Sequence, residues 1–338
     1  MFYETIRLQL LANNLNTNVT TDTGLSVENK TYYDMNLIRE ATPNLVHQQF
    51  GQKRPIPKNG GKKIEFRKFA PLAKALTALT EGVTPDGKKM SVTNIEATVA
   101  QYGDYITQSD VLELTAIDNT IVEATKMLGN QAGLTLDTLC RNVINAGNNV
   151  MYAPKSNGTA VTSRAGLDAT CALTVDVVRR AATKLKNQNA PKINGDYVAI
   201  IHPSAAYDLM SDPEWKEWSK YTTPEHMFEG EIGKIAGVRF VETTEAKIFE
   251  GTDDGAPSGL GVFSTLFIGE GAYGVTEITG GGLQTIIKQK GSAGTADPLD
   301  QRSTIGWKAM TVSEILVPQY LVRVESCSPV YSATAKAN

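Results

Sequence analysis

The feature that most constrains the fold is a helical pattern over residues 118–147. Apolar residues recur there at steps of three and four positions: Ile117, Ile121, Ala124, Leu128, Ala132, Leu136, Leu139 and Val143. This spacing lays one apolar stripe along a helix, for which Asp118 or Asn119 offers an N-cap and Gly147 an end. At 1.5 Å per residue such a helix is about 45 Å long. We therefore expect one long structural helix, weakened locally by Gly129 and Gly133.

Composition excludes several classes of protein. The chain has 338 residues, of which 41% are hydrophobic and 20% charged, as in ordinary globular domains. It has no apolar run long enough to span a membrane, and its first residues do not form a signal peptide pattern. The net charge of −3 argues against a free-standing nucleic-acid binder. The chain has three cysteines, Cys140, Cys171 and Cys327, and none of them forms a CxxC pair. We therefore expect neither a disulfide framework nor a zinc site, and we expect the protein to occupy a reducing compartment.

Residues 50–106 predict a projecting β-hairpin. An alternating strand over 62–70 and a second extended run over 91–106 flank the segment 71–90, which contains the turn sequence Thr84-Pro85-Asp86-Gly87. A two-stranded hairpin alone is only marginally stable in water. We therefore expect this one to find its packing partner on another chain.

The same region is strongly basic. From Lys53 to Lys74 it holds eight Lys or Arg residues against the single Glu65. Three interpretations are open: contact with acidic surface on a neighbouring subunit, contact with nucleic-acid phosphates, or a solvated face. The candidate inter-subunit contacts are Lys53, Arg54, Lys58, Lys62, Lys63, Arg67, Lys68, Pro85, Asp86 and Gly87.

The rest of the chain is expected to form an arm, a mixed domain and two closing strands. Residues 1–30 are rich in Asn and Thr and read as an arm. Helices are predicted over 175–189, over 203–210 and from Pro213, and strands over 197–201, 238–243, 261–268 and 283–289. Two final strands, 303–310 and 312–324, are expected to pair with each other and flank the long helix.

The chain offers no convincing catalytic constellation. Gly269–Gly274 matches G-x-G-x-x-G, but a strand-like sequence follows where a dinucleotide site needs a helix, so a bend between strands is favoured. His47, His202 and His226 lack the spacing of known catalytic motifs and suit capping or anchoring. We therefore expect no enzyme activity and no catalytic, cofactor-binding or metal-binding residues. A dinucleotide-binding enzyme remains a remote alternative.

Three stretches resemble one structural family. Gly195–Pro203 and Gly230–Thr243 resemble the axial domain, and Thr80–Gly87 the extended-loop tip, of tailed double-stranded DNA bacteriophage major capsid proteins. The resemblance implies the Hong Kong 97-type capsid fold, an α+β fold with an N-terminal arm, an extended loop, a peripheral domain with a long spine helix, and an axial mixed α/β domain. The corresponding ranges are 1–30 for the arm, 50–106 for the extended loop, 31–49, 107–172 and 300–330 for the peripheral domain, 173–299 for the axial domain, and 331–338 for a C-terminal tail.

The resemblance also implies a function and partners. Copies of the chain would self-assemble into hexamers and pentamers of an icosahedral phage head in the bacterial host cytoplasm. The shell would contact packaged double-stranded DNA non-specifically, work with portal, scaffold or decoration proteins, and involve no membrane. The leading alternative is an encapsulin-like cellular nanocompartment shell.

Overall fold

The computed structural model describes residues 37, 40–41, 45–69, 72–79, 81–84, 86–115, 120–219, 233–292 and 297–338. The chain divides into two compact units. The first comprises residues 1–43, 103–132 and 283–308, and the second comprises residues 44–102, 133–282 and 309–338. Helix α4 (Thr120–Asn145) and strand β13 (Arg302–Ile315) contribute residues to both.

A seven-stranded mixed sheet forms the centre of the second unit. Its strands follow the order β5-β14-β10-β6-β8-β7, with β9 paired to β10. Strand β10 runs antiparallel to both of its long neighbours, and every residue of β10 and β6 is buried, as expected of strands covered on both faces. The bounds are β5 (Val150–Tyr152), β6 (Tyr197–Ile201), β7 (Lys234–Ile235), β8 (Val238–Glu242), β9 (Ile248–Phe249), β10 (Val262–Ile268) and β14 (Leu321–Ser326).

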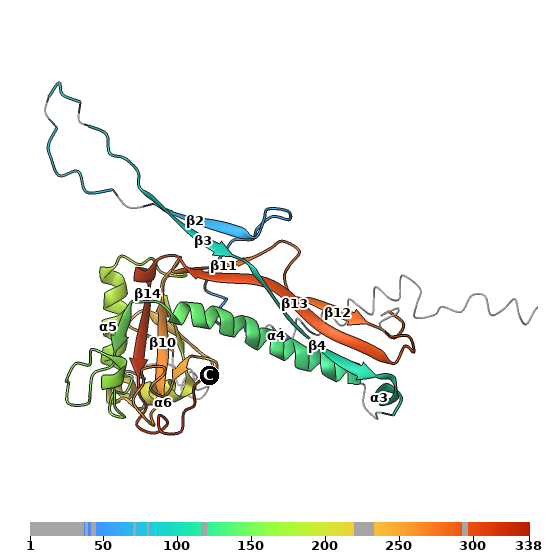
Figure 1. Ribbon diagram of the computed structural model, residues 1–338. Coiled ribbons are helices and arrows are strands. Elements are labelled where there is room, and N and C mark those ends of the chain that lie inside the picture. The colour runs from blue at the N-terminus through green and yellow to red at the C-terminus, as the bar shows by residue number, and fades with distance from the viewer. Residues whose placement is uncertain are drawn as a thin grey trace, which may run out of the picture. The chain divides into compact units, whose positions relative to one another are not determined.

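Helices cover this sheet on both faces (Figure 1). Helix α5 (Val175–Asn187) buries its apolar stripe with the side chains of alternate sheet residues, and Thr174 caps it by accepting a hydrogen bond from the Val177 N–H (3.5 Å). Short helices α6 (Pro203–Ser211) and α7 (Pro213–Ser219) follow β6. On the opposite face, Cys140 and Ile144 of α4 pack with residues of β6 and β10.

A second sheet contributes strands to both units. Within the second unit, β11 (Tyr273–Glu277) pairs parallel with β1 (Gln52–Lys53) and antiparallel with the end of β13. Within the first unit, β12 (Gln284–Lys288) and β4 (Ala100–Ser109) both pair with β13. The described chain also has two 3-10 turns, Arg164–Gly166 and Pro318–Tyr320, and helix α3 (Asp110–Thr115).

In the first unit, α4 is tied to the sheet by a short polar relay. The indole N–H of Trp307 donates to Gln131 Oε1 (3.2 Å), and the Gln131 amide donates to Asp104 Oδ2 (2.7 Å). Gly129 lies against the backbone of Leu37, where an added Cβ would come within 2.8 Å of the carbonyl oxygen. This glycine therefore permits a close approach, so its role is more than the local weakening expected from propensity.

The long helix confirms the periodicity prediction but not every buried position. The predicted stripe holds at Ala124, Leu128, Ala132 and Leu136, which are buried. Towards the C-terminal end the buried positions are Asp137, Cys140, Arg141, Ile144 and Asn145, whereas Leu139 and Val143 are only half-buried. A sequence pattern that counts only apolar residues misses this shift because two of the buried side chains are charged.

The prediction that the last two strands pair with each other is wrong. Residues 302–315 form one strand, β13, that pairs with β11, β12 and β4, and β14 joins the other sheet between β10 and β5. Thr311 offers no turn chemistry at the predicted break, and it continues the ladder opposite Glu277. The chain instead breaks at Pro318, after which Val322 and Val324 enter the core.

One smaller expectation changes and another is confirmed. The predicted second hairpin strand, 91–106, is two strands, β3 (Val92–Thr98) and β4, which pair with different partners. Gly269–Gly274 is the expected bend, and it links β10 to β11 of the other sheet. The arm over 1–30, the capping residues 118 and 119, His226 and Pro85 lie outside the described residues. The domain boundaries taken from the family resemblance stay predictions.

Candidate inter-subunit surface

The predicted hairpin is present as an antiparallel pair of strands, here called the stem. Strand β2 (Lys63–Phe69) pairs with β3 along seven registered positions, from Lys63 opposite Thr98 to Phe69 opposite Val92. The two strands form a sheet of their own, and the loop between them extends away from β10, β14 and α5 (Figure 1). A two-stranded sheet needs one packed face to be stable in water.

That packed face lies at the base of the stem. Phe66 is buried and, with Ala97, packs on Leu316. Gly274 of β11 makes room for the phenyl ring, because an added Cβ there would lie 2.8 Å from Phe66 Cζ. The last glycine of the G-x-G-x-x-G match is therefore explained by packing against the stem, and not by a phosphate.

The opposite face of the stem contributes little stability of its own. Glu65 lies directly opposite Glu96, a like-charge pair that disfavours the ladder. The Lys63 ammonium lies 3.4 Å from a Glu96 carboxylate oxygen, but both side chains are more than half exposed, so this ion pair is weak. The stem therefore depends on its packed base, and its distal end has nothing within the described chain to pack on.

The loop between the strands, residues 70–91, carries the main exposed apolar surface of the described chain. Its described residues form neither helix nor strand, and a hydrogen bond from Lys88 Nζ to the Ala73 carbonyl oxygen (3.0 Å) crosses it. Five large apolar side chains are solvent-exposed: Leu72 (60%), Leu76 (87%), Leu79 (77%), Val83 (63%) and Met90 (73%). Several large apolar side chains exposed on one loop make it a candidate interaction surface.

The candidate contact residues from the sequence fall into four places. Lys53 lies in β1 and Arg54 follows it; Lys58 lies in the turn before the stem; Lys62, Lys63, Arg67 and Lys68 are in or next to β2; Asp86 and Gly87 lie in the loop. Most of their side chains are exposed. Arg54, Arg67 and Lys68 line one pocket of about 120 Å³, and none of the other candidates contributes to it. Their role as contacts stays a proposal.

The charge of the chain is divided sharply between this region and the rest. Residues 53–74 carry a net charge of +7, which leaves 25 Lys and Arg against 35 Asp and Glu elsewhere, a net charge of −10. Opposite charges on different parts of one chain favour contact between copies, and they steer the orientation of that contact. The basic stem and the rest of the chain are therefore electrostatically complementary.

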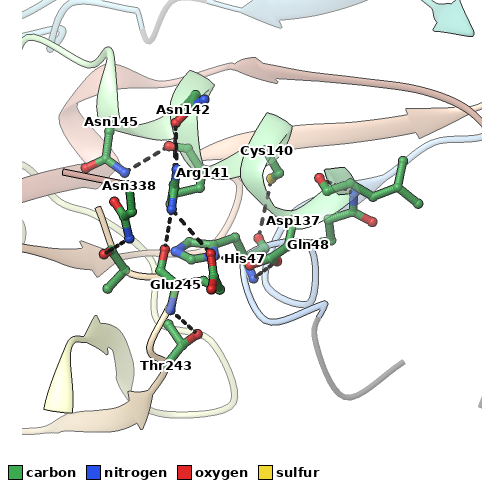
Figure 2. Close-up of polar contacts among 12 residues, drawn as sticks. His47, Gln48, Asp137, Cys140, Arg141, Asn142, Asn145, Thr243, Glu245 and Asn338 are labelled. Carbon is green, nitrogen blue, oxygen red and sulfur yellow. Dashed lines mark hydrogen bonds and ion pairs between the residues drawn. The ribbon is translucent and has the colours of Figure 1, made fainter. Parts of the chain in front are cut away.

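A buried polar cluster next to α4 contains residue types that occur in catalytic sites, so it is the second candidate functional site. His47 donates its backbone N–H to Asp137 Oδ1 (2.7 Å), and its Nδ1 lies 2.6 Å from Asp137 Oδ2, with both side chains fully buried (Figure 2). The Cys140 thiol donates to the His47 carbonyl oxygen (3.6 Å), and Arg141 donates to that of Glu245 (2.8 Å).

This cluster has the residue types of a catalytic triad but not the chemistry. Burial raises the pKa of the Cys140 thiol to about 12, so the thiolate needed for nucleophilic attack does not form at neutral pH. His47, Asp137 and Cys140 have no solvent exposure through which a substrate could reach them. The cluster instead anchors the segments around His47 and Glu245 to α4.

His202 and Trp215 also have structural roles. His202 caps α6, since its Nδ1 accepts a hydrogen bond from the Ser204 N–H (3.1 Å). Trp215 packs against the core of the second unit. No group of three or more potential metal ligands occurs within the described ranges, and none of the described helices is long and apolar enough to cross a membrane.

Sequence reasoning missed two features of the surface. The exposed leucines were not singled out, although Leu72, Leu76 and Leu79 stand in a short segment that lacks the alternation of a strand. The pocket of Arg54, Arg67 and Lys68 depends on β1 pairing with β11, which brings Arg54 beside the stem, and no local pattern encodes that pairing.

The sequence model of the phage capsid protein family matches residues 73–324. The capsid protein of cyanophage P-SCSP1u is 16% identical, with a TM-score of 0.65 over 84% of this chain and 88% of that chain. The capsid of Ralstonia phage GP4 is 16% identical, with a TM-score of 0.66 over 83% of this chain and 88% of that chain. The capsid of cyanophage Pam1 is 14% identical, with a TM-score of 0.66 over 86% of this chain and 92% of that chain. No curated protein sequence matches.

Proposed function

The chain belongs to the phage capsid protein family, and from this premise we propose that its copies assemble into hexamers and pentamers of an icosahedral shell around double-stranded DNA. Its fold is the Hong Kong 97-type capsid fold expected from the sequence. The protein is a structural component of the virion and not an enzyme. The proposal concerns how the shell is built and what it holds.

One observation carries the proposal: the loop exposes five large apolar side chains, which pack on nothing within the part of the chain that the structure describes. Fully burying one leucine side chain stabilises a contact by about 1.5–3 kcal/mol. Five exposed apolar side chains on one loop would therefore add several kcal/mol to the free energy of association if a neighbouring copy buried them. The stem is basic and the rest of the chain carries a net negative charge, so attraction between the stem of one copy and the acidic surface of another would set the orientation of that contact.

The domain layout expected from the resemblance extends this proposal. The axial range 173–299 would converge at the centres of hexamers and pentamers, while the peripheral ranges and the loop would join neighbours. Portal, scaffold or decoration proteins would act on the assembled shell, and assembly would take place in the bacterial host cytoplasm. The near-neutral total charge suits a wall that encloses DNA without binding it tightly.

Electron microscopy of the purified protein tests the proposal directly. We expect closed particles of uniform size. Reversing the stem charges should then lower particle yield at physiological salt, with the substitutions Lys62→Glu, Lys63→Glu, Arg67→Glu and Lys68→Glu made together. The matched control exchanges Lys and Arg at the same four positions, which preserves the charge and should preserve assembly.

The outcomes separate the three interpretations of the basic region. Lower yield in the reversed variant alone supports the inter-subunit role. Normal particles that have lost salt-sensitive DNA binding would support phosphate contacts instead, and no change in either property would support a solvated face. A gene neighbourhood with portal and terminase genes supports a DNA-filled head over a nanocompartment with protein cargo.

A further inference from the structure

Three cationic residues line one small pocket where the stem meets the turn between β10 and β11. Arg54, Arg67 and Lys68 line this pocket of about 120 Å³, together with Gln52, Phe66 and Gly271. Like charges held close together repel each other, and the repulsion is stronger beside low-dielectric protein than in bulk water. The arrangement is therefore favourable when a negative group joins it.

The backbone around the pocket is fixed by strand pairing. The Arg54 N–H donates to the Val275 carbonyl oxygen (3.2 Å), directly after β1 pairs with β11. The Arg54 guanidinium carbon lies 5.9 Å from the centroid of the buried Phe66 ring. Arg67 and Lys68 are successive residues of β2, and Lys68 is partly buried. Arg54 and Lys68 therefore line the pocket from two separate parts of the chain, on the face of the stem that carries Phe66, whereas strand alternation assigns the Arg67 side chain to the opposite, exposed face.

Within the described ranges, no carboxylate lies within 4.0 Å of these three side chains, whereas Lys63 farther down the strand has Glu96 as its partner. Gly271 has a φ of +71°, and an added Cβ there would meet no atom within 4 Å, so this side of the pocket is open. We propose that the pocket is an oxyanion site that takes one carboxylate or phosphate group.

The side chains suit an oxyanion of this size. A guanidinium presents paired N–H donors that match two oxygens of a carboxylate or phosphate, and a lysine ammonium adds a point charge. The ligand has two possible sources: an Asp or Glu side chain of a second copy, or free inorganic phosphate. The first source rests on the proposed function, and the net charge of −10 outside residues 53–74 supplies many such carboxylates.

Titration of inorganic phosphate into the unassembled full-length chain, followed by ³¹P NMR at low ionic strength, tests the pocket. We expect saturable binding that Arg54→Gln weakens by about tenfold, the effect of losing one charge-assisted hydrogen bond. Lys58→Gln removes the same charge outside the pocket and should change binding less than twofold. Lys68→Gln provides a second variant, and thermal melts verify that each one folds. Binding that does not saturate, or equal weakening by Lys58→Gln, would overturn the proposal.

A second arm identifies the source of the oxyanion. Phosphate is added to an assembly reaction at saturating concentration, with chloride at matched ionic strength as the control. Competition that lowers particle yield assigns the site to a carboxylate of a second copy, and unchanged yield assigns it to phosphate. The binding arm does not require assembly: a chain that binds phosphate but forms no particles refutes the proposed function alone. Particles from a wild-type chain without saturable phosphate binding refute the pocket alone.

Discussion

Replacing the three exposed leucines of the loop with serine should abolish assembly and leave the subunit folded. The change is Leu72→Ser, Leu76→Ser and Leu79→Ser made together. These side chains are 60%, 87% and 77% exposed in the single chain, so they contribute little to its own stability. We expect the free energy of unfolding to change by less than about 0.5 kcal/mol for each substitution, as for other exposed positions.

The effect on the contact between copies should be far larger. If a neighbour buries the exposed parts of these side chains, they contribute about 4–6 kcal/mol together. Because 1.4 kcal/mol corresponds to a factor of ten, their loss should weaken the contact by at least about 10³-fold. A shell repeats the contact in every subunit, so a loss of this size should leave free subunits or small oligomers.

Sedimentation velocity and negative-stain electron microscopy measure the outcome, and circular dichroism melts show whether the subunit is folded. Thr77→Ala in the same loop is the matched control, since it changes an exposed polar residue and should not affect yield. Particles of the triple variant at wild-type yield would refute the argument that the loop supplies the contact. Loss of the folded subunit would refute the premise that these leucines lie outside its core.

Three further predictions concern the subunit itself. Burial raises the pKa of Asp208 to about 6, so the folded chain binds this proton more tightly than the unfolded chain, and the free energy of unfolding falls as the pH rises from about 4 to 6. In urea unfolding at pH 7, the Asp208→Asn variant should be about 1 kcal/mol more stable than wild type, after allowance for solvent screening. At about pH 3.5 the two proteins should not differ in stability. Asp137→Ala should lower the free energy of unfolding by about 3 kcal/mol, because it leaves the buried His47 without its partner. Asp137→Asn retains a hydrogen-bond acceptor and should lower the free energy of unfolding less. Gly129→Ala should lower the melting temperature despite its better helix propensity, because the Cβ would clash with Leu37; a higher melting temperature would contradict that packing.

Periodicity predicted the elements whose pattern is local. The long helix, α5 and β6 were each predicted within a few residues, because their apolar spacing reflects burial of one face or of both. The Gly269–Gly274 bend was also predicted, because a strand follows it where a cofactor site needs a helix. The family resemblance gave the fold class, which the structure and the comparisons confirm.

Features that depend on distant partners were not predictable from the sequence. The final strands were wrongly paired because alternation in β13 and β14 shows that both are strands but does not identify their neighbours. Asp137 and Arg141 fall on the buried face of α4 because His47 and Glu245, some 90 and 104 positions away, satisfy them. A charged residue is assigned to solvent until such a partner is known.

The stem and loop combine weak internal stability with strong capacity for external contact, and this combination suits a shell that must close without errors. The like-charge pair of Glu65 and Glu96 and the unpacked distal end mean that, in the proposed assembly, the loop would gain much of its packing only when a neighbour supplies it. Part of the apolar contribution is then offset by the cost of ordering the loop. Each contact is consequently weaker than its buried area suggests, so a misplaced subunit can dissociate. In the proposed assembly, a complete shell would remain stable because several such contacts would hold every subunit at once.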